Sequence, residues 1–268
     1  MNFPKLIKPK MKVYLGLLIA VIVLMIVLSR YSRPSVGTPG SGGDTIDVAL
    51  EYSPLSFYTY GDTLGGYNYD LLRLISKQQG IVFKYHPMTS LDESLQLLNE
   101  DKFDIVAAQT PATVEFKNKY LFSNPVYIDN QVLVQHKDDK GNVKITSQLN
   151  LAGTTLCVAK GSPVVSRIKS LSREIGEIIY VEEKDKSQEQ LFLMVACGDV
   201  PYAVVNARTA TALASTRNDV DIATAVSFNQ FHSWVIKKSN DSLLKKVNRW
   251  IKDAEDSKAG KELKSRYF

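Results

Sequence analysis

The chain has 268 residues, of which 44% are hydrophobic and 23% are charged, a composition typical of a globular protein large enough for two lobes of ordinary domain size. The formal net charge is +5, but four lysines lie within residues 1–12, where no acidic residue balances them. The remainder holds 29 basic and 28 acidic residues and is nearly neutral, so charge gives no reason to expect nucleic acid as a partner.

A run of uncharged, almost wholly apolar residues follows the basic tail at 13–28. As a helix at about 1.5 Å per residue it spans roughly 24 Å, slightly short of a bilayer core unless Lys12 and Arg30 extend outward. The segment predicts a single transmembrane anchor. A cleaved export signal is the alternative, although no polar segment separates Ser29 from the apolar run.

The lysine bias predicts that residues 1–12 form a cytoplasmic tail. The protein is then a single-pass protein of the inner (cytoplasmic) membrane whose carboxyl-terminal body faces the periplasm. Residues 29–44 are rich in Gly, Ser and Pro and lack hydrophobic periodicity, so they predict a flexible linker between the anchor and the body.

The body begins at Thr45 with alternating strand and helix patterns. Residues 46–50 predict a strand, 69–79 predict an amphipathic helix that ends at Gly80, and 91–98 predict a second helix.

A short, continuously apolar run at 105–108 predicts a buried parallel strand. In open parallel sheets, ligands bind just beyond the carboxyl ends of the strands. Gln109 and Thr110 follow this strand directly and are therefore candidate ligand-binding residues.

The second half of the body predicts another α/β lobe. Residues 131–137 predict a strand that leaves the first lobe, and 151–162 begin a new strand and helix unit in which Ser162 caps the helix and Pro163 takes its first position. We expect the chain to cross between lobes near 131–137 and again near 222–228. Two crossings form a hinge, and two hinged lobes enclose a cleft.

Several segments resemble one family. They are IDVALEYSPLSFY, GGYNYDLLRLISKQQGIVFKYHP, LDESLQLLNEDKFDIVAAQTPAT and YLFSNPVY in the first half, and NQVLVQHK, LAGTTLCVAKGS and PYAVVNARTATAL in the second. The chain resembles the family 3 periplasmic solute-binding proteins, and among them the amino-terminal, non-catalytic domain of the membrane-bound lytic murein transglycosylase F family. The resemblance covers nearly everything after residue 44. It implies the two-lobed, α/β type II periplasmic binding protein fold, with lobe 1 at 45–133 and 225–268 and lobe 2 at 134–224.

Two departures from the family pattern concern the ligand. Amino-acid binders of the family carry Thr-x-x-Arg, whose arginine holds the ligand carboxylate; here Thr113 is present, but Phe116 replaces the arginine. The family aspartate that holds the ligand ammonium is replaced by Asn206. A phenyl ring cannot make the bidentate, charge-assisted bond of a guanidinium, so the resemblance implies a ligand other than a standard free amino acid.

The resemblance also places candidate ligand-binding residues on both lobes. Some have a structural alternative, which is core packing under a loop for the residues of the first loop, cleft-filling packing for Phe116 and helix capping for Ser162. The candidates are Tyr52, Ser53, Phe57, Gln109, Thr110, Phe116, Ser162 and Asn206.

Cys157 and Cys197 are the only cysteines, and an extracytoplasmic location permits a disulfide between them. Two buried free thiols are the alternative. The cysteines and the three isolated histidines lack metal-ligand spacing, and there is no Gly-rich phosphate loop or nucleophile elbow. We expect neither a metal nor a cofactor.

The first functional hypothesis is a monomeric, membrane-tethered, periplasmic binding module that captures a small ligand, such as a cell-wall fragment, between its lobes. The alternative is a module that has lost its ligand and docks to a peptidoglycan enzyme or a transporter. An enzyme is the weakest hypothesis, because in the transglycosylase family the catalytic glutamate belongs to a separate carboxyl-terminal domain and this sequence ends at Phe268.

Overall fold

The computed structural model describes residues 18, 25 and 45–268. The predicted tail, most of the predicted anchor and the predicted linker lie outside the described residues. Among the residues that are described, no helix is long and apolar enough to cross a membrane. Residues 45–268 contain two α/β lobes, each built on a five-stranded sheet.

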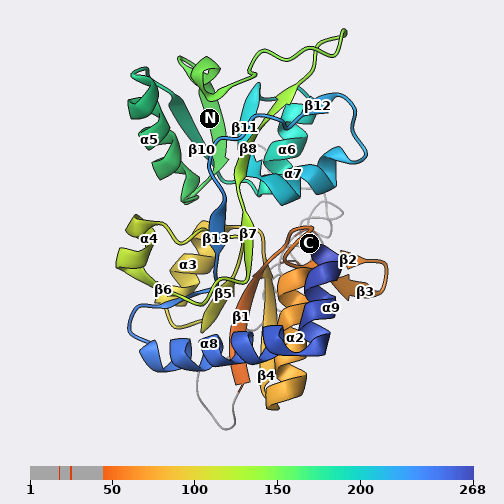
Figure 1. Ribbon diagram of the computed structural model, residues 1–268, viewed down its shortest axis with the longest axis vertical. Coiled ribbons are helices and arrows are strands. Elements are labelled where there is room, and N and C mark those ends of the chain that lie inside the picture. Colours follow the sequence, from red (N-terminus) through yellow and green to blue (C-terminus); the bar gives the residue numbers. More distant parts are fainter. Residues whose placement is uncertain (1–17, 19–24, 26–44) are drawn as a thin grey trace, which may run out of the picture. The chain divides into compact units, whose positions relative to one another are not determined.

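The first lobe has a mixed sheet with the strand order β4-β1-β5-β14-β6 (Figure 1). Its strands are β1 (Thr45–Glu51), β4 (Val82–Met88), β5 (Ile105–Ala107), β6 (Tyr120–Phe122) and β14 (Val235–Lys237). Strand β1 pairs in parallel with β4 and β5, and β14 pairs antiparallel with β5 and β6. The buried parallel strand predicted at 105–108 is confirmed as β5.

Helices cover both faces of this sheet. They are α2 (Tyr67–Gln79), α3 (Leu91–Asn99), α4 (Val114–Lys119), α8 (Asp241–Asp256) and α9 (Lys258–Tyr267), and a small hairpin of β2 (Tyr58–Tyr60) and β3 (Thr63–Gly65) precedes α2. Helix α2 stops at Gly80, as predicted, and Gly80 has the left-handed conformation of a helix cap, with φ of 69°. Ser90 caps α3, since its hydroxyl oxygen accepts from Glu93 N at 3.2 Å.

The second lobe has the strand order β10-β9-β11-β8-β12. Its elements are β8 (Gln131–His136), a 3-10 turn (Gln148–Leu151), β9 (Thr155–Ala159), α5 (Val164–Ile175), β10 (Tyr180–Lys184), α6 (Gln188–Ala196), β11 (Tyr202–Asn206), α7 (Ala207–Ala214) and β12 (Val220–Asp221). Strands β9, β10 and β11 are parallel, so their carboxyl ends lie on one edge.

Two short antiparallel strands connect the lobes, β7 (Tyr127–Asp129) and β13 (Gln230–His232). They run side by side between the two sheets in Figure 1. The crossings therefore lie outside the predicted ranges 131–137 and 222–228. The sequence predicts that the strand at 131–137 leaves the first lobe. In the structure this strand, β8, already belongs to the second sheet, where it pairs with β11 and β12.

Successive residues of the central strands point into different cores. In β1, Val48 and Leu50 belong to the core on one face of the sheet, and Ala49 belongs to the core on the other. In β11, Val205 and Val204 divide in the same way between the two cores of the second lobe. Both faces are covered by helices, which explains why these strands are continuously apolar in sequence.

Candidate functional site

A cavity lies between the lobes, where the carboxyl ends of the strands of both sheets meet. The first lobe lines it with Glu51, Thr89, Leu91, Ala108, Gln109 and Thr110. The second lobe lines it with Gln131, Ala159, Ser162, Pro163, Val164, Ser187, Gln188, Val204, Val205 and Asn206. The location is the one that parallel-sheet topology favours for a ligand.

The first-lobe wall is fixed by a buried network of hydrogen bonds. Trp234 Nε1 donates to Asn68 Oδ1 at 3.0 Å, and Asn68 Nδ2 donates to Ser56 Oγ at 2.8 Å. The Ser56 hydroxyl donates to the Ala107 carbonyl at 3.0 Å, and Ser53 Oγ accepts from Gln109 Nε2 at 3.0 Å. These bonds hold the loop after β1 against the end of β5.

Glu51, the last residue of β1, contacts the backbone at the end of β5. Gln109 N donates to Glu51 Oε2 at 2.7 Å. The backbone and side chain of Gln109 are thus both held by neighbours from its own lobe.

The second-lobe wall is built around Asn206, the last residue of β11. Asn206 N donates to Gln188 Oε1 at 2.7 Å, and Asn206 Oδ1 accepts from Gln131 Nε2 at 3.2 Å. Gln188 is the first residue of α6, whose capping residue Ser187 accepts from Gln190 N through its hydroxyl oxygen at 3.3 Å. The helix start therefore places Gln188 beside the strand end.

Polar side chains join the two walls directly. Gln109 Nε2 donates to Thr209 Oγ1 at 3.0 Å, and Asn206 Nδ2 donates to the Gln109 carbonyl at 3.3 Å. Gln188 Nε2 donates to Glu51 Oε1 at 3.4 Å. In this arrangement the residues of the cavity hold the lobes together.

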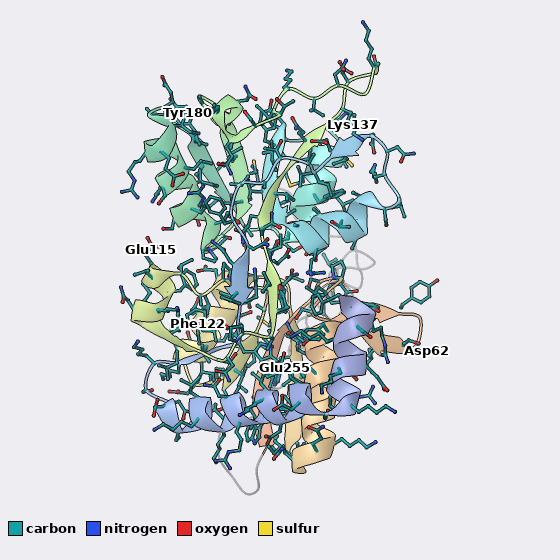
Figure 2. All side chains as sticks on the ribbon, in the orientation of Figure 1. Asp62, Glu115, Phe122, Lys137, Tyr180 and Glu255 are labelled. Carbon is teal, nitrogen blue, oxygen red and sulfur yellow. The ribbon has the colours of Figure 1, made fainter. Side chains whose placement is uncertain are left out.

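Two further contacts join the lobes at the rim. Lys160 Nζ lies 2.8 Å from Asp92 Oδ2, and the Ser166 hydroxyl donates to Glu115 Oε1 at 2.6 Å. Figure 2 shows Glu115 on the side of the first lobe that faces the second. Both contacts are exposed, so we expect them to contribute less than the buried bonds of the cavity.

Gly161 makes the close approach at the rim possible. Its φ is +72°, a conformation that favours glycine, and a Cβ added there would lie 3.1 Å from Asp92 Cβ in the opposite lobe. A side chain at position 161 would therefore press against the first lobe.

The cavity is electrically almost neutral. Among the described residues that line it, none is a lysine or an arginine. Burial, together with repulsion from Glu189, raises the pKa of Glu51 to about 7, against the bond from Gln109 N. Burial also raises the pKa of Glu189. Near pH 7 Glu51 is thus protonated in a large fraction of molecules.

Two of the residues that line the cavity also have polar side-chain atoms that are not satisfied. Thr110 Oγ1 and Gln131 Oε1 are buried and have no hydrogen-bond partner among the described residues. The cavity volume is about 30 Å³, room for roughly two water molecules. The site can accept hydrogen bonds from N–H or O–H groups, and a larger molecule can enter only if the lobes move apart.

The structure brings together four of the predicted ligand residues in this cavity: Gln109, Thr110, Ser162 and Asn206. Ser53 lies directly behind Gln109 and is buried. Ser162 caps α5 only in part, because its hydroxyl oxygen accepts from Val164 N at 3.4 Å and the helix begins at Val164 rather than at the predicted Pro163.

The predicted aromatic residues lie elsewhere. Phe57 is 5% exposed and belongs to the core of the first lobe, which is the structural alternative for this residue. Tyr52 is 38% exposed, packs edge-on against Phe57, and does not line the cavity. Phe116 lines a second gap between the lobes, beside the cavity, and packs near Tyr120.

Sequence reasoning missed several residues of the site, among them four whose side chains make the hydrogen bonds described above. Glu51 ends a strand, Gln131 begins one, and Gln188 and Thr209 lie in the first turns of helices. The rule that identifies Gln109 could have identified Glu51 as well, because β1 is parallel to β5 and ends at the same edge. The other three depend on the approach of the second lobe, which no local pattern encodes.

Cys157 and Cys197 do not form the disulfide that the sequence permits, and only one of the two free thiols is buried. Cys157 is a buried free thiol, whose Sγ lies 3.6 Å from Glu182 Oε2, and Cys197 is an exposed free thiol at the end of α6. The structure also holds no cluster of three His, Cys, Asp or Glu side chains suited to a metal within its described ranges.

Two α/β lobes, two crossing strands and a polar cavity at the carboxyl ends of the strands define a hinged substrate-binding protein. The chain belongs to the bacterial extracellular solute-binding proteins, family 3, which match residues 45–268. The resemblance inferred from sequence is thereby confirmed.

Curated relatives are named membrane-bound lytic murein transglycosylase F. The protein from Shewanella pealeana is 24% identical over 169 residues, which cover 63% of this chain and 34% of that protein. The protein from Idiomarina loihiensis is 22% identical over 241 residues, covering 90% of this chain and 52% of its own length. The chain thus spans between about a third and a half of these relatives.

Solved structures of amino-acid-binding proteins share the fold. An ancestral arginine-binding protein bound to arginine has a TM-score of 0.73 and 25% identity, with 84% of this chain and 98% of that chain covered. Holo ArgBP from T. maritima has a TM-score of 0.68 and 23% identity, with coverages of 84% and 96%. These likenesses confirm the two-lobed periplasmic binding protein fold.

Proposed function

We propose that the protein is a binding module that encloses a small, uncharged, hydrogen-bonding ligand between its lobes. The observation that carries this proposal is the lining of the cavity, which has no lysine or arginine among its described residues and includes two residues with unpartnered buried atoms, Thr110 Oγ1 and Gln131 Oε1. Buried polar atoms are normally hydrogen-bonded, so a ligand N–H or O–H at these positions removes an unfavourable desolvation.

A standard free amino acid fits this lining poorly. Its carboxylate needs a cation or an array of donors, and no lysine or arginine is among the described residues of the cavity. Asn206 stands at the end of β11, where it offers an amide to the ligand, and Glu51 is only partly ionised near pH 7. Amide and hydroxyl groups, such as those of a cell-wall fragment, suit the lining better.

Ligand capture requires motion about β7 and β13. The ligand enters when the cross-lobe bonds of Gln109 and Asn206 break, and it then contacts both walls as the lobes close again. Its differential affinity for the closed arrangement shifts the equilibrium toward closure.

The setting of this module belongs to the same proposal. An anchor at residues 13–28 and a linker at 29–44 would hold the body on the periplasmic side of the cytoplasmic membrane. The body would bind rather than catalyse, as a monomer, and a transporter or a cell-wall enzyme would respond to its closure.

A second candidate function is a docking module that has lost its ligand. The small cavity volume of about 30 Å³ and the cross-lobe bonds between the protein's own side chains favour it. In this case the closed arrangement would be permanent, and the surface would bind a peptidoglycan enzyme or a transporter.

A thermal shift assay on the purified full chain separates the two candidates. The panel would contain N-acetylated sugars, muropeptides, N-acetyl amino acid amides and free amino acids. A ligand at about 100 times its Kd stabilises the folded state by about 2.7 kcal/mol, so a true ligand raises the Tm measurably. Stabilisation by an uncharged amide compound supports ligand capture, and no shift with any compound favours docking.

A further inference from the structure

A second gap between the lobes lies beside the cavity. We name it the outer groove; it has a volume of about 480 Å³. Helix α3 lines it with Leu95 and Gln96, the α4 segment with Phe116, and the second lobe with Ser162 and Val165. Ser162 also lines the cavity, so the two spaces share a wall.

The outer groove has the chemistry of a site for an amphipathic ligand. Leu95, Phe116 and Val165 provide an apolar surface, and Phe116 is half-buried rather than sealed in the core. Gln96 is exposed and provides an amide at the edge. Aromatic rings next to amide groups bind sugar rings and peptide units, which have an apolar face and a polar edge.

The charges of the outer groove are largely compensated. Asp92 is paired with Lys160 at 2.8 Å, and Glu183 Oε2 accepts from Gly161 N at 3.0 Å. Lys119, at the end of α4, adds a positive charge to the lining. The groove therefore favours an uncharged ligand, as the cavity does.

We propose that the outer groove binds the outer units of an elongated, uncharged, amide-bearing oligomer whose first unit occupies the cavity. This inference rests on the proposed function and adds that the ligand has at least two units, the second of which packs on Phe116. Because the groove has walls from both lobes, each added unit also favours closure.

Calorimetric titration of the full chain with the monomer, dimer and trimer of N-acetylglucosamine tests this proposal. A parallel series of N-acetyl alanine amides with one, two and three residues distinguishes a glycan from a peptide. We expect the trimer of one series to bind at least about tenfold more tightly than its monomer, a difference of about 1.4 kcal/mol.

Phe116→Ala should abolish most of this gain and leave monomer affinity unchanged. Phe122→Ala is the matched control, because Phe122 packs against the same core but does not line the groove. Gln96→Trp is a second test at an exposed position, where a bulky ring obstructs the groove without disturbing the core.

The outcomes separate the two proposals. If monomers and trimers bind equally in both series, or if the gain survives in both Phe116→Ala and Gln96→Trp, the outer groove is not a binding site, and capture in the cavity stands. If no compound of either series binds, the outer groove proposal and the proposed function fail together.

Discussion

Gln109 and Thr209 lie in different lobes, 100 positions apart in the sequence, and the side-chain amide of Gln109 donates to the hydroxyl of Thr209 at 3.0 Å. Both side chains are buried. Gln109 is held in place by its own lobe through Ser53 and Glu51. This bond must break when the lobes move apart to admit a ligand. When the lobes close again, the bond must re-form or be replaced by contacts with the ligand.

Thr209→Val should therefore weaken closure without disturbing either lobe. Valine keeps the shape of threonine and removes the hydroxyl, so the loss should be about 1 kcal/mol. Thr211→Val is the control, because Thr211 lies on the same helix, is exposed, and donates only to the Ala207 carbonyl. Small-angle scattering should show a larger radius of gyration for Thr209→Val alone. Equal values for both variants would show that the bond does not hold the lobes.

Gly161→Ala should prevent the lobes from closing fully. Gly161 and Gly176 both have positive φ, +72° and +80°, so alanine costs roughly 1–2 kcal/mol of backbone strain at either position. Only position 161 faces the other lobe, with Asp92 3.1 Å from the added Cβ, whereas nothing lies within 4 Å of one at 176.

The two glycine variants should thus lose similar stability in urea denaturation, while only Gly161→Ala loses affinity for the ligand. An equal loss of affinity in Gly176→Ala would mean that backbone strain, and not contact between lobes, is responsible.

Much of the fold could be predicted from the sequence, because the patterns that specify it are local. The apolar run that becomes β5 and the Gly80 stop of α2 each depend on a few neighbouring residues. The crossing segments could not be placed as well. β7 and β13 have only three residues each, and β8 carries the same apolar pattern whether it leaves a lobe or belongs to one.

The site was only partly predictable, for a related reason. Gln109 and Asn206 follow buried strands, and parallel topology brings such residues to the edge of a sheet. Phe57 lies in a segment that resembles the ligand-binding loop of the family, yet its ring packs in the core of the first lobe. Thr209 becomes part of the site only because the second lobe closes over Gln109.

Glu51→Gln should change how stability depends on pH. The pKa of Glu51 is raised from 4.5 to about 7, so the folded state favours the protonated form. This stability is present below about pH 4.5 and is lost as the pH rises through 7, a change on the order of 3 kcal/mol. Unfolding in urea at pH 4 to 8 should show wild type losing stability relative to Glu51→Gln as the pH rises.

Two comparisons make this pH experiment specific. Burial lowers the pKa of His232 to about 4, so His232 adds stability with rising pH between about 4 and 6.5, but it does so equally in wild type and variant. Glu177→Gln, at an exposed loop position, should leave the pH profile unchanged. A flat difference between wild type and Glu51→Gln would contradict the buried, partly protonated carboxyl.

The rim ion pair should matter little and should depend on salt. The side chains of Lys160 and Asp92 are 56% and 45% exposed. A double-mutant cycle of Lys160→Met and Asp92→Asn should therefore show a coupling of less than about fivefold in ligand affinity, vanishing as the salt concentration rises. A coupling well above this value that does not change with salt would show that this ion pair is the main contact that holds the lobes closed.

Calorimetric titration with one amino acid in three forms tests the central claim most directly. Glutamine as the free zwitterion, as the N-acetyl derivative and as the N-acetyl amide keeps the same side chain and differs in the charges and blocking groups at its two ends. The described residues that line the cavity include Gln109, Gln131 and Asn206 and no cation, so the cavity should bind the uncharged N-acetyl amide most tightly and the zwitterion most weakly. Micromolar binding of free glutamine that is lost when both of its ends are blocked would contradict the account.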